Sequence, residues 1–323
     1  MRSTADWIAD RVMDSSQPGD EVCVWIGASV GLSAASFEML EEAFEGSVRR
    51  LVESGRDCEI FIANDAVSIL KSPPLLGRGV AAIVGTGSIV LGAHPACRDG
   101  VIRRGGYEWP VGDRAAGIWM TVESLRLVLE DIQDRGSAQY TSPLLDRLCD
   151  YFGISSEVTN RVPATHVALA RAEILSAVLG QGGEDRKRRI AGFVYPYLFD
   201  LARIDPVLPH DPIAAKVISR SVRFIVEDIS SVSETLAAFT ADTPNARERL
   251  PLVVAGNIGA NPIYQQQLMA AISECKYVEP TKVIGDAAPT FAQLAMHFLK
   301  SDPRERKLIG RSFDPMHEVH RLL

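Results

Sequence analysis

Four short segments of the sequence carry residue types that could bind or transfer a phosphoryl group. The first is centred on Asp65, which follows the apolar run 60–62. An aspartate at the carboxyl end of a buried strand lies where open α/β sheets bind ligands, and it could accept the proton of an attacking hydroxyl. The alternative is that Asn64 or Asp65 caps the next helix, and the local sequence alone favours that interpretation.

The second segment is a glycine-rich turn between two apolar runs, 80–84 and 89–92. It consists of Gly85, Thr86, Gly87 and Ser88. Glycine allows close approach of backbone N–H groups to phosphate, and the two hydroxyls add donors. No Gly-Lys-Ser/Thr follows, so the segment is not a P-loop. A plain hairpin turn explains the four residues equally well.

The third segment, residues 105–117, combines glycines, aromatics and a carboxylate before a helical pattern. Gly106, Tyr107 and Asp113 are its candidate ligands. Aromatic rings can cover the apolar face of a sugar, while carboxylates bind sugar hydroxyls. Asp113 could instead cap the helix, but so many glycines in one loop favour a close backbone approach to a ligand.

The fourth segment is Gly256 and Asn257, which end the apolar run 252–255. A buried strand that ends in glycine before a helix is a common geometry for nucleotide contacts. An ordinary strand–helix turn is at least as good an explanation.

The elements that must position these segments alternate between strand and helix, which predicts an α/β fold. We expect strands at 22–26, 60–62, 80–84, 89–92, 252–255 and 276–278. We expect helices at 4–14, 36–54, 262–274 and 286–300, a mostly helical stretch over 119–240, and a final helix in the charged tail.

Composition excludes several classes of protein. The net charge of -7 and the pI near 5.5 argue against a nucleic-acid partner. No apolar run approaches the ~20 residues of a membrane helix, so no membrane partner is expected. The five cysteines form no C-x-x-C pair, which fits free thiols in the cytoplasm and argues against cysteine ligation of a metal.

The order of the four segments resembles the N-acetylglucosamine kinases and BadF/BadG/BcrA/BcrD-type ATPases of the actin-like superfamily. N-D-A at 64–66 precedes G-T-G-S at 85–88, and a G-G-(x)5-G-D block ending in G-x-W follows. The matching residues of that block are Gly105, Gly106, Gly112, Asp113, Gly117 and Trp119. Segments 189–205, 255–257 and 285–295 are also similar, so the resemblance runs from about residue 20 to 300.

The resemblance implies two actin-like, ribonuclease H-like α/β lobes around a nucleotide cleft. The first lobe would span 1–78 and the second 79–323, with the last helix able to return to the first lobe. The reaction would transfer the γ-phosphoryl group of ATP, with Mg²⁺, to an amino sugar. By resemblance, Asp65 would be the general base, residues 85–88 would hold the phosphates, Gly256 and Asn257 would border adenosine, and Asn64, Gly106, Tyr107 and Asp113 would line the sugar site.

The sequence departs from the family pattern in several places. No D-x-G-G-T phosphate motif precedes Asp65, so we expect an incomplete first lobe, in a chain that is shortened, mis-started or degenerate. An incomplete sheet would expose an edge, which makes a homodimer a candidate assembly. Arg114 stands where the family has glutamate, Tyr107 where it has tryptophan, and Asn257 where it has its second adenosine glycine.

We therefore rank three candidate functions. The first is an ATP-dependent kinase of N-acetylglucosamine or a related hexosamine. The second is a non-catalytic relative that binds a sugar or nucleotide. The third is an ATPase subunit that drives electron transfer, although no cysteine adjoins the G-T-G-S turn and Cys97 lies beyond the following strand.

Overall fold

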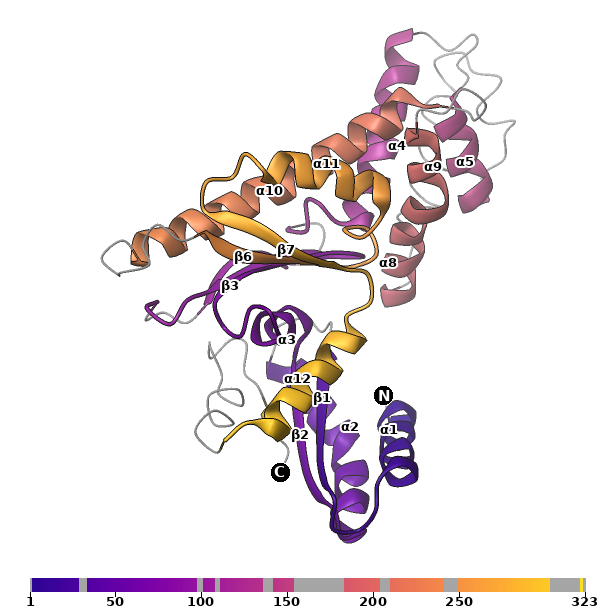
Figure 1. Cartoon of the computed structure of the whole chain (residues 1–323). Coiled ribbons are helices and arrows are strands. Elements are labelled where there is room, and N and C mark those ends of the chain that lie inside the picture. Colours follow the sequence, from indigo (N-terminus) through magenta and orange to yellow (C-terminus); the bar gives the residue numbers. More distant parts are fainter. Residues whose placement is uncertain are drawn as a thin grey trace.

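The computed structural model describes residues 2–28, 34–97, 101–107, 111–135, 142–153, 183–203, 210–240, 249–302 and 320–321. Within these residues the chain forms two β-sheets with helices packed on their faces (Figure 1). The smaller sheet holds the two N-terminal strands and the last strand, and the larger sheet holds the five strands between α3 (Asp65–Lys71) and residue 284.

The larger sheet has five strands in the order β5-β4-β3-β6-β7. Their bounds are β3 (Gly79–Val84), β4 (Ser88–Ala93), β5 (Val101–Gly105), β6 (Leu250–Ala255) and β7 (Val278–Ile284). The first three form an antiparallel meander, and β6 and β7 run parallel to β3. The central strands are buried on both faces, which explains their unbroken apolar sequences.

Helices cover both faces of this sheet. α10 (Pro212–Thr240) and α11 (Pro262–Ile272) pack on one face, and α3 packs on the other (Figure 1). Alternate residues of β3 serve the two cores, because Ala82 belongs to the cluster under α10 whereas Ala81 belongs to the cluster under α3.

The smaller sheet has the order β1-β2-β8. Strands β1 (Glu21–Ala28) and β2 (Asp57–Asn64) are parallel along their whole length, and β8 (His320–Arg321) is antiparallel to β2. Helices α1 (Arg2–Ser15) and α2 (Ala34–Glu53) join the core on one face, while α3 and α12 (Ala288–Lys300) join the core on the other. In the described part of the chain β1 is a terminal strand, and dimerisation through its edge stays a prediction.

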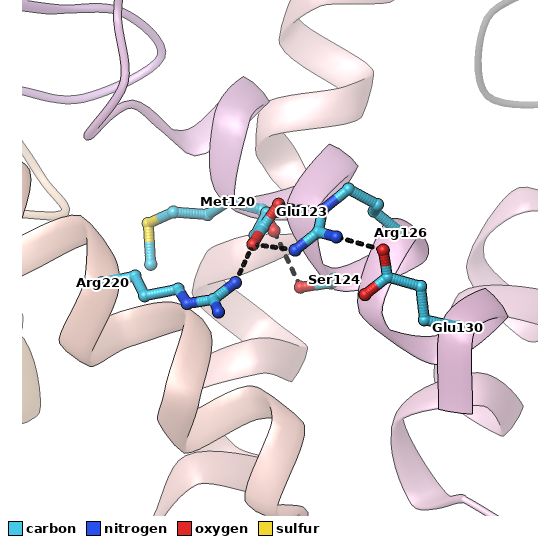
Figure 2. Close-up of polar contacts among 6 residues, drawn as sticks. All are labelled: Met120, Glu123, Ser124, Arg126, Glu130 and Arg220. Atoms are coloured by element: carbon cyan, nitrogen blue, oxygen red, sulfur yellow. Dashed lines mark hydrogen bonds and ion pairs between the residues drawn. The ribbon is translucent and has the colours of Figure 1, made fainter. Parts of the chain in front are cut away.

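A second helical group lies beyond the larger sheet. It contains α4 (Gly117–Arg135), α5 (Pro143–Phe152), α8 (Gly183–Gly192), the π-helix η1 (Val194–Leu198) and α9 (Phe199–Ala202). The α4 helix is tied to α10 by Glu123, which lies between Arg126 and Arg220 (Figure 2). Glu123 is almost fully buried, and two Arg126 nitrogens lie 2.7 and 2.8 Å from its oxygens.

The α/β prediction is confirmed, but three elements differ from expectation. The edge strand β5 was not expected, because its two arginines weaken the apolar signal. The last long strand begins at Val278 rather than occupying 276–278, because Pro280 and polar residues interrupt its sequence. At the C-terminus residues 320–321 are a strand rather than a helix, and 303–319 lie outside the described residues.

Two further findings concern the described residues as a whole. All five cysteines are free thiols, as the sequence predicts. None of the helices in the described ranges combines the length and apolar character that a membrane crossing needs.

Candidate functional site

The turn between β3 and β4, residues 85–87, is held by the first turn of α4. We call it the hairpin tip. The carbonyl oxygen of Gly85 accepts a hydrogen bond from the Gly117 N–H at 2.9 Å, and that of Thr86 accepts from the Ile118 N–H at 3.5 Å. Two carbonyl groups of the tip therefore face the positive end of α4, and this fixes the orientation of the turn.

The same turn presents hydrogen-bond donors. The N–H groups of Thr86 and Gly87 have no acceptor among the described residues, and the Thr86 side chain is exposed. A Cβ placed on Gly85 would meet no atom within 4 Å. The tip thus combines backbone donors with open space, which is the chemistry that phosphate oxygens require.

The loop before α4 is bound to this tip through Asp113. Its buried carboxylate accepts a hydrogen bond from the Gly106 N–H at 3.1 Å, and the same N–H donates to the Ser88 carbonyl at 2.8 Å. A Cβ on Gly87 would lie 3.0 Å from the second carboxylate oxygen of Asp113. The carboxylate is therefore hydrogen-bonded within its own loop and lies close to the hairpin tip, and the Asp113 backbone carbonyl accepts from the Ala116 N–H just before α4.

The turn after β6 lies against the end of β3. Gly256 has a φ of +101°, and a Cβ there would collide with the carbonyl oxygen of Val84. The same carbonyl accepts from the Gly259 N–H at 3.1 Å. Only glycine suits this backbone conformation and close approach. Asn257 is exposed beside it, so the predicted phosphate and adenosine segments are neighbours.

Tyr107 lies on the outside of its loop. The Arg103 guanidinium is 4.6 Å from the centre of the Tyr107 ring, and its Nε donates to the Gly105 carbonyl at 2.9 Å. The ring is 60% exposed. The neighbouring residues 108–110 lie outside the described residues, and the role of Tyr107 as a sugar ligand stays a prediction.

The charge reversal at Arg114 is balanced by α10. Its guanidinium lies 3.3 Å from the Asp228 carboxylate and 3.9 Å from that of Glu227, and it stacks over the Phe224 ring at 4.7 Å. Sequence reasoning missed this group because its members are more than a hundred residues apart. Arg114 thus has its own carboxylate partners on α10.

The last residue of β2, Asn64, and the first residue of α3, Asp65, have different roles. The buried Asn64 side chain is the N-cap of α3, accepting from the Ala66 N–H at 3.0 Å. Asp65 is the first residue of the helix, and one of its carboxylate oxygens accepts from the same N–H at 2.8 Å. Loss of solvent raises the pKa of Asp65 to about 6, although its backbone hydrogen bonds act in the opposite direction.

The structure brings three of the four predicted segments together and leaves Asp65 on a separate element. The hairpin tip, the loop around Gly106 and Asp113, and the Gly256 turn are joined by the contacts given above. Asp65 opens α3, which packs between the two sheets in one apolar cluster with Trp25 and Leu91. No hydrogen bond within the described residues links Asp65 to the hairpin tip.

Metal ligands do not gather into a cluster in the described ranges, where no group of three or more His, Cys, Asp or Glu side chains could hold an ion. A magnesium ion that is held by substrate phosphates and only one or two carboxylates needs no such cluster. The N–H donors of the hairpin tip suit the oxygens of a phosphate and not a metal ion.

Comparisons with known proteins identify the fold. No protein-family model matches the sequence, and no curated protein matches it. Two crystal structures described as "Putative N-acetylglucosamine Kinase" do match. The protein of Chromobacterium violaceum is 21% identical, with 84% of this chain and 75% of that one covered at a TM-score of 0.50. The protein of Porphyromonas gingivalis is 17% identical, with 89% and 80% covered at a TM-score of 0.57. The predicted actin-like fold is thereby confirmed.

Proposed function

We propose that this chain is an ATP-dependent kinase of N-acetylglucosamine or a related amino sugar. The observation that carries the proposal is the hairpin tip, where the Thr86 and Gly87 N–H groups have no acceptor among the described residues and a Cβ on Gly85 would meet open space. The fold shared with two proteins described as "Putative N-acetylglucosamine Kinase" supports it. Asp65, at the carboxyl end of β2, adds a carboxylate with a raised pKa.

In this proposal, the hairpin tip and the Gly256 turn would bind the nucleotide, and Asp65 would accept a proton. The tip donors would hold the β- and γ-phosphates, and the Gly256 turn with Asn257 would border the adenosine. Asp65 would take the proton of the attacking sugar hydroxyl, since with a pKa of about 6 it is ionised at neutral pH. Mg²⁺ bound with the nucleotide would neutralise phosphate charge.

The sugar would be bound by the groups that the structure leaves available. The amide oxygen of Asn64 is occupied by its capping hydrogen bond, so the amide NH₂ group is the part that would reach a hydroxyl. The exposed Tyr107 ring would cover an apolar sugar face. Gly106 would line the sugar site as part of the loop backbone, because the space that a Cβ would fill there is taken by Ile89 and Arg103.

The test is phosphoryl transfer from Mg-ATP to a panel of hexosamines, with the sugar phosphate identified by mass spectrometry. We expect a product with N-acetylglucosamine or a close analogue in the wild type. Asp65→Asn should lower kcat by about a thousandfold, because the proton acceptor is lost. Failure of the wild type to modify any hexosamine would overturn the catalytic proposal.

Gly85→Ala provides a second arm that tests the phosphate site. The added methyl group enters open space in the free protein, so the melting temperature should change little. It should weaken Mg-ATP binding about tenfold or more by obstructing the phosphates. Gly46→Ala is the matched control, since a Cβ on Gly46 in α2 also meets open space but lies in the other half of the molecule. If the wild type, Gly85→Ala and Gly46→Ala bind Mg-ATP with equal affinity, the phosphates do not bind beside Gly85.

A non-catalytic ligand-binding protein is the second candidate, and it is favoured by Arg114, which stands where the family pattern has glutamate and pairs with Asp228 of α10. Binding of Mg-ATP and sugar without turnover would select this function. The electron-transfer ATPase is less well supported, because Cys97 is buried in the core of the larger sheet. A thiol in that position does not suit a cluster shared between subunits.

A further inference from the structure

Asp113 combines three features that a simple surface ligand does not need. Its side chain is 8% exposed, its φ is +62°, and its carboxylate accepts a hydrogen bond from the Gly106 backbone. A non-glycine residue with positive φ costs about 1 kcal/mol or more unless its surroundings hold it there. We therefore expect the contacts of the carboxylate to compensate for the cost of this backbone conformation.

The carboxylate lies between two loops that are separate in sequence. One oxygen is bound to Gly106 in the loop that follows β5, and the other would touch a Cβ on Gly87 in the hairpin tip. The Gly106 N–H is shared with the Ser88 carbonyl, at the base of that tip. A displacement of the Asp113 carboxylate would break its hydrogen bond to Gly106 and change the packing beside Gly87.

Glycine at position 87 makes this contact possible. A methyl group on Gly87 would lie 3.0 Å from the Asp113 oxygen, which is tighter than an ordinary van der Waals contact. A side chain at position 87 would therefore require the carboxylate or the tip to shift by a few tenths of an ångström. The hairpin tip and Asp113 are fitted to each other.

We propose that Asp113 is a positioning residue whose buried carboxylate fastens the Gly106 loop to the hairpin tip, so that the sugar and phosphate sites hold one relative geometry. Only the effect of Asp113 on the reaction rests on the proposed function; its role in holding the loops does not. It differs from a sugar-ligand role, in which the carboxylate would bind a hydroxyl and leave the two loops independent. Asp113 then acts on the reaction through Thr86 and Gly87 rather than by touching the reacting atoms.

The experiment compares amide hydrogen exchange in the free protein for the wild type, Asp113→Asn and Asp113→Gly. Asparagine keeps an acceptor oxygen and tolerates positive φ, so exchange should stay within about twofold of the wild type. Glycine suits the φ of +62° but removes the acceptor. We expect roughly three- to tenfold faster exchange in peptides covering residues 85–88 and 105–107.

Asp20→Gly is the matched control. The Asp20 carboxylate also accepts from a backbone N–H in a turn, that of Gln17 at 2.7 Å, but it lies beside the smaller sheet. It should leave exchange at residues 85–88 unchanged. If Asp113→Gly also leaves residues 85–88 unchanged, Asp113 serves only its own turn and the proposal is wrong.

Calorimetry with Mg-ATP and with N-acetylglucosamine provides the second readout. A positioning residue predicts that Asp113→Gly weakens both affinities, whereas a sugar ligand predicts a loss confined to the sugar. If the wild type binds neither compound, the proposed function fails, yet the exchange measurement still decides the role of Asp113.

Discussion

At the scale of single residues, the neighbours Asn64 and Asp65 are the most informative. The sequence left open which of them caps the helix and which could act as a base. The structure assigns the cap to Asn64 and leaves Asp65 with a raised pKa. Local sequence could not separate the two roles, because both side chains can bind the same N–H group.

The pKa of Asp65 makes a prediction about stability. Because its folded-state pKa of about 6 exceeds the ordinary value of 3.8, the stability that it contributes is fully present below pH ~4 and is lost as pH rises through 6. Asp65→Asn removes the buried charge. We expect the free energy of unfolding of the variant to exceed that of the wild type by about 1 kcal/mol at pH 8. At pH 4 we expect no such difference.

Urea denaturation at the two pH values measures this difference. Asp57→Asn, at the other end of β2, is the control, and it should show no comparable gain at pH 8. A wild type that is more stable than Asp65→Asn at pH 8 would mean that the carboxylate is stabilised in its charged form. In the catalytic assay, kcat/KM should rise with pH through about 6, as Asp65 ionises.

At the scale of elements, the central strands of the larger sheet could be predicted, whereas its two edge strands were missed or misplaced. The central strands β3, β4 and β6 are covered on both faces, so their sequences are continuous apolar runs. The edge strands β5 and β7 carry arginine, proline and lysine, which edge positions tolerate. Their pairing depends on neighbours far along the chain, and no local pattern encodes it.

The position of α4 is an element-scale feature on which the site depends. Its first turn binds the hairpin tip, and Glu123 ties its second turn to α10 (Figure 2). Burial alone would raise the pKa of Glu123, but hydrogen bonds from Arg126 and Arg220 outweigh it and hold the pKa below its usual value. The stability that this group contributes is present above pH ~4.5 and is lost as pH falls through the lowered pKa.

Arg220→Ala should therefore destabilise the protein by about 1–2 kcal/mol at pH 7, because Glu123 stays buried with one partner fewer. The loss should shrink at acidic pH, where Glu123 takes up a proton. Arg223→Ala is the matched control on the same helix, since Arg223 is exposed and pairs with Glu227 at 3.6 Å. That change should cost less than about 0.5 kcal/mol by urea denaturation, and equal losses for the two arginines would contradict the role of Glu123.

At the scale of the whole molecule, the two sheets share one apolar core. Trp25 stacks on Phe61 with ring centres 4.9 Å apart, and Phe298 meets Phe61 edge-on at the same distance. This cluster also contains Leu91 and Val253 of the larger sheet. The sequence indicated that the last helix could return to the first sheet, but only the packing shows that one core joins both halves.

Phe298→Ala tests whether the two halves unfold as a unit. The side chain is 2% exposed, and its loss from a close-packed core should cost about 3–5 kcal/mol. Because the cluster spans both sheets, we expect one cooperative transition at a lower midpoint, seen at the same temperature by far-ultraviolet circular dichroism and by tryptophan fluorescence. Met296→Ala, on the same helix but 50% exposed, should leave the midpoint nearly unchanged. Two separate transitions in Phe298→Ala, with the Mg-ATP site retained after the first, would show that the larger sheet holds its fold and its site without the smaller one.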